Sequence, residues 1–252
     1  MKKRLFSFAG ILIFFIVWYG ISEMGIFRPY VFPSPGKVVK TLVEMAVSGE
    51  IVEDIVISFL RVVTGFLISF VIAFLLGVIR VLFPKSEQFY DFFIQFFRNV
   101  PPLAMIPLLI LWFGIGEVTK ILIIILASFF PMFLSIEKGF LTCDKRLIEV
   151  GVVFGYGNFE RFLKIILPSA LADILVGMRI GMGYSWRAII GAEMVAASTG
   201  LGHMILFAQQ MSRTDKVIVG ICVIGMVGYM VDKAFGLVIR SCVKGAGEDV
   251  FH

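Results

Sequence analysis

The stretch VVTGFLISFVIAFLLGVI, residues 62–79, runs for 18 residues without a single Asp, Glu, Lys or Arg. An α-helix rises about 1.5 Å per residue, so this stretch extends about 27 Å, close to the hydrocarbon thickness of a bilayer. Its apolar character is continuous, whereas the strands of a membrane barrel alternate polar and apolar residues. We therefore predict a transmembrane helix here.

The rest of the chain repeats this character. Residues 5–22 and 121–136 are also uncharged, and three further apolar stretches, 99–116, 174–195 and 217–239, are interrupted by prolines or charges. Of the 252 residues, 59% are hydrophobic and 16% are charged, against roughly 25% charged in soluble domains. The sequence predicts an all-α integral membrane protein with about six transmembrane helices.

The distribution of basic residues predicts the orientation. Twelve Lys and Arg residues fall on the side of the membrane that holds the N-terminus, and seven fall on the other side. The positive-inside rule then places both termini in the cytoplasm. The excess of basic residues on one side of the membrane accounts for the net charge of +5. This charge therefore does not indicate nucleic-acid binding, and we expect no nucleic-acid partner. The first span lacks a small-residue cleavage site after Trp18-Tyr19-Gly20, so we interpret it as a retained helix rather than a signal peptide.

Residues 1–55 are predicted to hold the first transmembrane helix and an extracytoplasmic amphipathic segment. Ser34 followed by Pro35 is typical of a helix N-cap with proline at the first helical position. The apolar residues of the following segment fall at helical spacing: Val39, Leu42, Val43 and Ala46. This pattern predicts a short helix lying on the outer face of the membrane.

Two of the spans carry stripes of small residues at four-residue intervals. The first stripe is Gly65, Ser69, Ala73 and Gly77, and the second is Gly177, Gly181 and Ser185. Small residues let helix backbones approach closely in membranes. We interpret both stripes as packing faces rather than ligand sites.

The third span begins at Arg98 and contains Pro101, Pro102 and Pro107. Each proline removes a backbone donor, so the helix is expected to bend or break. Broken helices in membranes often line water-filled cavities, but a kink that only improves packing is equally compatible with this pattern.

Residues 137–172 form a long, basic and polar connection between two spans, and long connections tend to be functional. The sequence predicts a short helix at residues 147–154 and a glycine turn at residues 155–158. It predicts a second helix at residues 159–166, which Pro168 ends. The product is a helix-turn-helix projection that faces the cytoplasm. A loop that merely connects two spans is the alternative.

This connection, with Glu149-Val-Gly-Val-Val-Phe-Gly155 followed by Ile165-Ile-Leu167-Pro168, resembles the EAA loop of permease subunits of binding-protein-dependent ABC importers. The glutamate, the glycine and the Leu-Pro pair keep the family's spacing. Val150 and Gly151 stand where the family has two alanines.

The resemblance extends over nearly the whole chain and is strongest to the nitrate/sulfonate/taurine branch of that family. The motifs that carry it, by their order and spacing together, are Pro33-Ser-Pro35, Ser58 with Arg61 and Gly65, residues 102–114, and Gly191-Ala-Glu-Met194 leading to Gly200-Leu-Gly202. The resemblance implies a fold like that of type I ABC-importer permeases.

In such permeases the loop forms coupling helices that sit in a cleft of the ATPase subunit. The resemblance therefore implies a transmembrane domain over residues 56–241, a coupling loop at about 138–172 and a cytoplasmic tail at 242–252. The residues implied in ATPase coupling are Glu149, Val150, Gly151, Gly155, Tyr156, Gly157, Asn158 and Pro168. Independently, a glycine turn permits close backbone approach, and a glutamate at the start of a short helix favours its positive end.

The resemblance also implies partners: ABC ATPase subunits, an extracytoplasmic solute-binding protein, a second copy of the chain and the lipid bilayer of a bacterial or archaeal cytoplasmic membrane. A heterodimeric pore stays open as an alternative. The chain contains no Gly-x-x-x-x-Gly-Lys-Ser/Thr motif, so we expect ATP and Mg²⁺ to bind the partner and no cofactor to bind here. The implied substrate is a small anion such as a sulfonate, taurine or nitrate, with a vitamin precursor as alternative.

We expect no catalytic residues and no metal site. The only histidines are His252 and His203, which we expect to be solvated near an outer loop. The cysteines Cys143, Cys222 and Cys242 are widely spaced. A membrane enzyme is therefore disfavoured. An ion-coupled secondary transporter is the other alternative, but it would need acidic groups at mid-membrane and an internal repeat.

Charges inside spans are costly and often face a partner or a wet cavity. The candidates for a solute pathway are Arg98, Arg179, Arg187 and Glu193, and Lys233 is a further intramembrane charge. The alternative for each is that it extends to the membrane surface or pairs with Asp173, Glu193 or Asp232.

Overall fold

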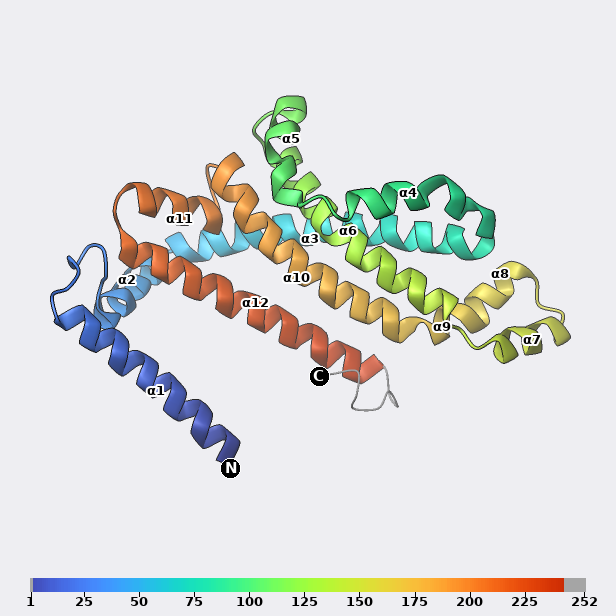
Figure 1. The fold of residues 1–252 in the computed structure, drawn as a ribbon, viewed down its shortest axis with the longest axis horizontal. Helices are drawn as coiled ribbons and strands as arrows, with labels where there is room; N and C mark the ends of the chain where they lie inside the picture. Colours follow the sequence, from blue (N-terminus) through green and yellow to red (C-terminus); the bar gives the residue numbers. More distant parts are fainter. Residues whose placement is uncertain (1, 243–252) are drawn as a thin grey trace. The chain divides into compact units, whose positions relative to one another are not determined.

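The computed structural model describes residues 2–242 and, from residue 12 on, their side chains. All the regular structure in this range is helical (Figure 1). The tail predicted at 242–252 lies outside the described residues except for Cys242, as does His252. The chain divides into two compact units, one made of residues 1–58 and 198–227 and the other of residues 59–197 and 228–252.

The first unit contains α1 (Lys2–Glu23), α2 (Pro35–Val47), the start of α3 (Glu50–Leu82), α11 (Leu201–Gln210) and the start of α12 (Thr214–Cys242). The Trp18 indole N–H donates to the Pro33 carbonyl at 3.1 Å, which ties the end of α1 to the segment before α2. Asp215 at the start of α12 accepts a hydrogen bond from Thr41 of α2 at 2.9 Å. Polar contacts thus fasten α2 against its neighbours.

The predicted helix after Ser34 is confirmed. The Ser34 side chain accepts a hydrogen bond from the Lys37 amide, and Pro35 is the first residue of α2. Val39, Leu42 and Val43, on the apolar face predicted to lie on the membrane, are exposed in the protein. The residues that α2 buries are the neighbouring set Val38, Thr41 and Met45.

Helix α11 was not predicted. It begins where the Asp54 carboxylate accepts from the Gly200 amide at 2.9 Å and the Ser58 hydroxyl accepts from the Leu201 amide at 3.0 Å. Side chains of α3 therefore satisfy two backbone donors that a helix start leaves without intrahelical partners. His203 is the third residue of this helix, next to the loop before it, and is half-buried and stacked on Phe207.

The second unit is built around α6 (Glu117–Leu141). Ile123, Ile124, Met132 and Ile136 of this helix are fully buried, and Phe133 is nearly so. The remaining elements of the unit are the rest of α3 and α12, the short 3-10 segments η1 (Pro84–Ser86) and η2 (Pro102–Met105), α4 (Glu87–Phe97), α5 (Ile106–Phe113), α7 (Lys145–Val153), α8 (Asn158–Arg161), the π-helical η3 (Phe162–Ile166), α9 (Leu167–Ser169) and α10 (Leu171–Ala196).

The small-residue stripe of α3 packs against α6. A Cβ atom at Gly65 would lie 2.7 Å from a methyl carbon of Ile124, and one at Gly77 would lie 3.0 Å from Ile136. Between them, the Ser128 hydroxyl of α6 donates to the Ser69 hydroxyl of α3 at 3.0 Å. This stripe is therefore a packing face, as predicted.

The stripe of α10 packs against α6 in the same way, and the two helices run side by side in Figure 1. A Cβ atom at Gly177 would lie 2.8 Å from the Ser135 Cβ, and Met132 fills the space beside Gly181. Ser185 is fully buried. The prediction of a second packing face is confirmed.

The proline-rich span is broken rather than continuous. The helical segments 84–97 and 102–113 meet at 91°, because Pro101 and Pro102 interrupt the chain between them. The expected bend is confirmed, but the span predicted at 99–116 contains only the short η2 and α5. The preceding helix α4 was not predicted.

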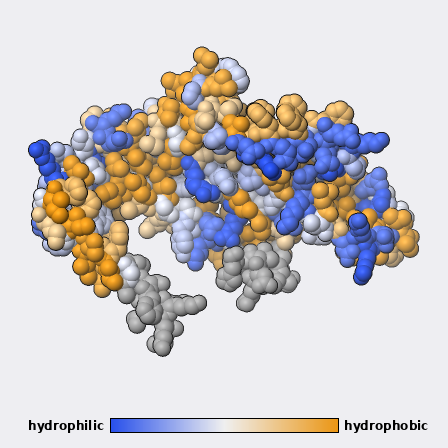
Figure 2. Space-filling model, in the orientation of Figure 1, coloured by the Kyte–Doolittle hydropathy of each residue, from blue (hydrophilic) through white to orange (hydrophobic). Residues whose placement is uncertain are grey.

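Within the part of the chain whose side chains are described, three helices, α3, α6 and α12, are long and apolar enough to cross a membrane, and the count rises to five if each bent pair forms one span. The second bent pair joins residues 158–169 to 171–196 at 64°. The span predicted at residues 5–22 falls on α1, whose side chains are described only from residue 12 on. Figure 2 shows apolar side chains over much of the visible face, and exposed Leu60, Leu67, Val71 and Leu75 follow α3, as lipid contact requires.

Candidate functional site

The loop between α6 and α10 begins with α7. The Asp144 carboxylate accepts a hydrogen bond from the Arg146 amide at 2.9 Å and caps this helix. Glu149 is the fifth of its nine residues and is exposed. The expectation that Glu149 stands at the helix start is therefore wrong, because Asp144 occupies that place.

A glycine turn ends α7. Gly155 has a φ of +76°, a left-handed conformation that glycine adopts without a steric penalty. Its amide donates to the Val152 carbonyl at 2.9 Å, and the Tyr156 amide donates to the Gly151 carbonyl at 2.9 Å. This pair of bonds is the Schellman arrangement of helix ends, so the predicted turn at 155–158 has a defined geometry.

The second arm of the loop starts at α8. The Gly157 amide donates to the Glu160 carboxylate at 3.1 Å, and the Lys164 ammonium lies 3.2 Å from the other Glu160 oxygen. The same ammonium sits 4.2 Å from the centre of the Tyr156 ring. Glu160 and Lys164 thus tie the turn to the second arm. Asn158 accepts a hydrogen bond from Arg161.

The second arm was predicted to end at Pro168, and it ends one residue later, at Ser169. Pro168 lies within α9, directly after the π-helical segment η3. The Leu167 amide donates to the Phe162 carbonyl, five residues back. This wider turn precedes the proline, whose missing N–H and ring normally interrupt an α-helix. The chain then bends by 64° between Ser169 and Leu171, where α10 begins.

Gly151 holds the two arms together. It is buried, and a Cβ atom there would lie 2.6 Å from the Ile165 Cδ1 and 3.1 Å from the Arg161 Cγ. The absence of a side chain at Gly151 therefore lets α7 approach the second arm closely. Gly151 acts inside the loop, whereas Val150 beside it is half exposed.

The tip of the loop carries exposed apolar side chains. Val153 is 86% exposed and Phe154 is 72% exposed, and Phe159 beyond the turn is also exposed. We call Val153, Phe154 and Phe159 the loop tip.

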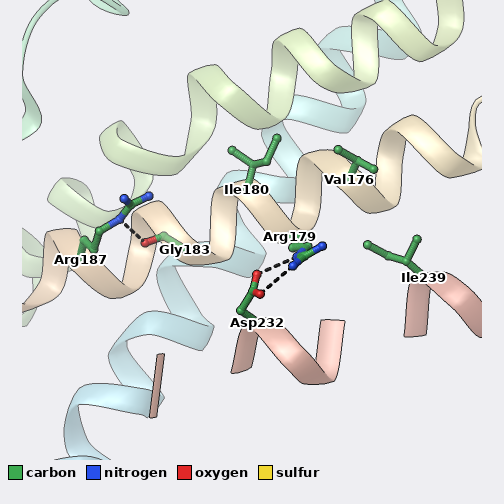
Figure 3. A pocket seen from close by; sticks show the side chains of 7 residues that line it. All are labelled: Val176, Arg179, Ile180, Gly183, Arg187, Asp232 and Ile239. Atoms are coloured by element: carbon green, nitrogen blue, oxygen red, sulfur yellow. Dashed lines mark hydrogen bonds and ion pairs between the residues drawn. The ribbon is translucent and has the colours of Figure 1, made fainter. Parts of the chain in front are cut away.

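Arg179 and Arg187 of α10 differ in their surroundings (Figure 3). Arg179 makes two hydrogen bonds, of 2.7 and 2.6 Å, to the Asp232 carboxylate of α12. Arg187 donates to the Gly183 carbonyl of its own helix at 3.0 Å and covers the Tyr184 ring at 4.7 Å. The structure thus pairs Arg179 with one of the three acidic partners considered from the sequence.

Arg179 and Arg187 border a common cavity of about 320 Å³. Arg98 borders another, of about 450 Å³, at the break before η2. Tyr184 lines this second cavity with Arg98, and sequence reasoning missed it because an aromatic residue in an apolar span carries no pattern of its own.

Glu193 is fully buried and accepts a hydrogen bond from Arg61 of α3 at 2.8 Å. Arg61 also contacts Glu117 at 2.7 Å, and Lys120 contacts Glu117 at 2.6 Å. Arg61 and Lys120, two of the seven basic residues counted on the outer side of the membrane, are both buried. The three-residue spacing of Glu117 and Lys120 is the only local signal of this cluster.

Several helices of lipid-spanning length, a broken span and a folded loop, with only helical regular structure in residues 2–242, define a multi-pass membrane protein. Residues 65–241 match the family model of the binding-protein-dependent transport system inner membrane component, and the chain belongs to this family. The predicted relationship to the nitrate/sulfonate/taurine permeases is confirmed.

The chain is 35% identical over 246 residues to the putative aliphatic sulfonates transport permease protein SsuC of Bacillus subtilis, covering 96% of this chain and 89% of that protein. It is 30% identical over 252 residues to the taurine transport system permease protein TauC of Escherichia coli, with 98% and 92% covered.

Among solved structures, an inward-facing conformation of the MetNI methionine ABC transporter matches with a TM-score of 0.63 and 17% identity. The match covers 77% of this chain and 95% of that chain. It confirms the type I importer fold.

Proposed function

We propose that this chain is the pore-forming permease of an ABC importer and that the loop tip docks onto a separate ATPase subunit. ATP and Mg²⁺ bind that partner, and this chain performs no hydrolysis. Closure of the ATPase then moves α7 and α8, and these pass the movement to α6 and α10, between which the loop is inserted.

The observation that carries this proposal is the exposure of the loop tip on a rigid support. Val153 and Phe154 are exposed, while the turn at Gly155 and the close approach at Gly151 fix the two arms. Exposed apolar groups lose contact with water when a partner covers them, at roughly 25 cal/mol per Å². A rigid loop also loses little conformational entropy on docking.

We further propose that Glu149 and Asn158 add polar contacts at the rim of this interface. Both side chains are exposed. Val150, Tyr156, Gly157 and Pro168 belong to the same loop, and within it Gly151 and Gly155 have the supporting roles described above. Polar rims around an apolar centre are typical of protein interfaces.

The proposed assembly contains two permease copies, the ATPase subunits and an extracytoplasmic solute-binding protein, in the cytoplasmic membrane of a bacterium or archaeon. Both termini lie in the cytoplasm. The substrate is a small organic or inorganic anion such as an alkanesulfonate, taurine or nitrate, in keeping with the names of the similar permeases. The binding protein sets which solute is delivered.

Copurification of the permease with its ATPase tests the docking surface. We expect Val153→Asp and Phe154→Ser to reduce the recovered ATPase by about tenfold each, because each removes apolar contact at the centre of the interface. Ser169→Asp, which introduces a charge at an exposed position of the same loop, is the matched control and is expected to copurify normally.

Glu149→Arg tests the rim and is expected to weaken copurification less than either tip variant, since rim charges contribute little to affinity. Normal ATPase recovery with both tip variants would contradict the proposal. Uptake that continues without any ATPase and collapses with the proton gradient would instead favour a secondary transporter.

A further inference from the structure

We propose that Arg98 and Arg187, together with Tyr184, form an anion-binding station at mid-membrane depth in the solute path. The inference rests on the proposed transport function and names the residues that receive the solute. It separates these two arginines from Arg179 and Glu193. The charges of Arg179 and Glu193 are each balanced by an oppositely charged residue of the same unit.

The first observation is the unbalanced charge of the two arginines. Arg179 forms a two-point contact with Asp232. Within the described residues, by contrast, neither Arg98 nor Arg187 lies within 4.0 Å of a carboxylate oxygen. Both side chains are exposed in the protein, so an arriving anion can reach a guanidinium that no carboxylate of the described residues neutralises.

The second observation is depth. Tyr184 is the fourteenth of the 26 residues of α10, and the Arg98 cavity is lined by residues 126–134, the middle of α6. Arg187 lies nine residues, or about 14 Å, from the nearer end of α10. A lipid headgroup does not reach this depth, so the anion is a transported solute.

The third observation is the direction of the Arg187 side chain. Its Nε donates to the Gly183 carbonyl, one turn back toward the helix centre (Figure 3). A side chain that extends to the membrane surface would point toward the nearer end of the helix. The Tyr184 ring and the Gly183 carbonyl hold Arg187 at mid-membrane instead.

The fourth observation is the lining of the Arg98 cavity. It contains no Asp or Glu, and its polar groups are Arg98, Asn99 and the Tyr184 hydroxyl. The cavity lies at the break of a membrane helix, where irregular backbone is expected to line a path. A small anion therefore finds donors there and no repelling carboxylate.

Uptake by the assembled transporter in proteoliposomes tests the station. With radiolabelled ethanesulfonate and the loaded binding protein, we expect Arg98→Gln and Arg187→Gln to lower uptake by about tenfold each, the effect of losing one charged hydrogen bond. ATP hydrolysis stimulated by the binding protein is expected to change by less than about twofold, because neither residue belongs to the loop. Arg187→Lys keeps the charge but loses the planar group that covers the Tyr184 ring, so it is expected to retain more uptake than Arg187→Gln and less than the wild type.

Lys233→Gln is the matched control. Lys233 is also an intramembrane cation, and its ammonium lies 5.3 Å from the centre of the Tyr229 ring. It lines neither the cavity that Arg98 borders nor the cavity that Arg187 borders. We expect uptake at the wild-type level. Wild-type uptake by Arg98→Gln and Arg187→Gln, or an equal loss with Lys233→Gln, would overturn the inference.

A second measurement does not depend on transport. Phenylglyoxal modifies accessible arginines, and mass spectrometry locates the products in the protein held in lipid nanodiscs. Ethanesulfonate is expected to slow the modification of Arg98 and Arg187 and to leave exposed Arg28 unchanged. Equal modification rates with and without ethanesulfonate would overturn the station. If the wild-type complex shows no ATP-dependent uptake, the proposed transport function fails, while this protection experiment still decides whether anions bind.

Discussion

The substitution Gly155→Ala isolates the role of one backbone conformation in the coupling loop. Gly155 has a φ of +76°, and its turn supports the hydrogen bond from the Tyr156 amide to the Gly151 carbonyl. No atom lies within 4 Å of the place a Cβ atom would occupy. Alanine therefore causes no clash, and its effect comes from the left-handed conformation alone.

The expected magnitude follows from that conformation. An L-residue other than glycine loses about 1–2 kcal/mol in the left-handed region. This change raises the population of the open turn about 5- to 30-fold. Asparagine tolerates the region better because its side chain bonds to the local backbone, so Gly155→Asn is expected to raise the population by about threefold or less.

Hydrogen exchange with mass spectrometry, on a peptide covering residues 150–157 of the purified protein, measures this opening. Gly155→Ala is expected to exchange about 5- to 30-fold faster than the wild type, and Gly155→Asn to lie near the wild type. A peptide from the middle of α10 serves as the internal reference. Unchanged exchange in Gly155→Ala, or an equal increase in both variants, would refute the reasoning.

Three further predictions concern stability in detergent, measured as the thermal midpoint. Gly65→Ala brings a methyl group against Ile124 and is expected to lower the free energy of unfolding by about 1–3 kcal/mol. In the control, Gly236→Ala, the added methyl group meets no atom within 4 Å, and no loss is expected. Equal losses in the two variants would argue against close packing of α3 on α6. Arg179→Ala and Asp232→Ala are expected to show a coupling energy of about 1 kcal/mol in a double-mutant cycle, and additive effects would contradict the ion pair. Ser58→Ala removes the hydroxyl that accepts a hydrogen bond from the buried Leu201 amide. This change is expected to lower the free energy of unfolding by about 1–3 kcal/mol. An unchanged stability would show that the hydroxyl does not cap α11.

The features that the sequence predicted correctly depend on local patterns. Uncharged runs located α3 and α6, and small residues at four-residue spacing identified the faces that pack on α6. Ser34 and Pro35 marked the start of α2. Each of these signals lies within one helix or at its end, so no knowledge of tertiary structure was required.

The features that the sequence did not predict depend on contacts between distant residues. The partners Arg61 and Glu193 are 132 positions apart, and no local pattern connects them. Helix α11 is capped by side chains of α3, because its own N-cap residue, Gly200, has no side chain. The burial of the polar residue Thr41 in α2 likewise depends on Asp215, which lies 174 positions away.

Site-specific photo-crosslinking tests the central claim most directly. A photoreactive phenylalanine replaces Phe154 at the loop tip or, as the control, exposed Tyr30 in the predicted extracytoplasmic segment, and the complete complex is irradiated in membranes. We predict a covalent product with the ATPase subunit from position 154 and none from position 30. An ATPase product from position 30, or none from position 154 in a complex that still hydrolyses ATP, would contradict the account.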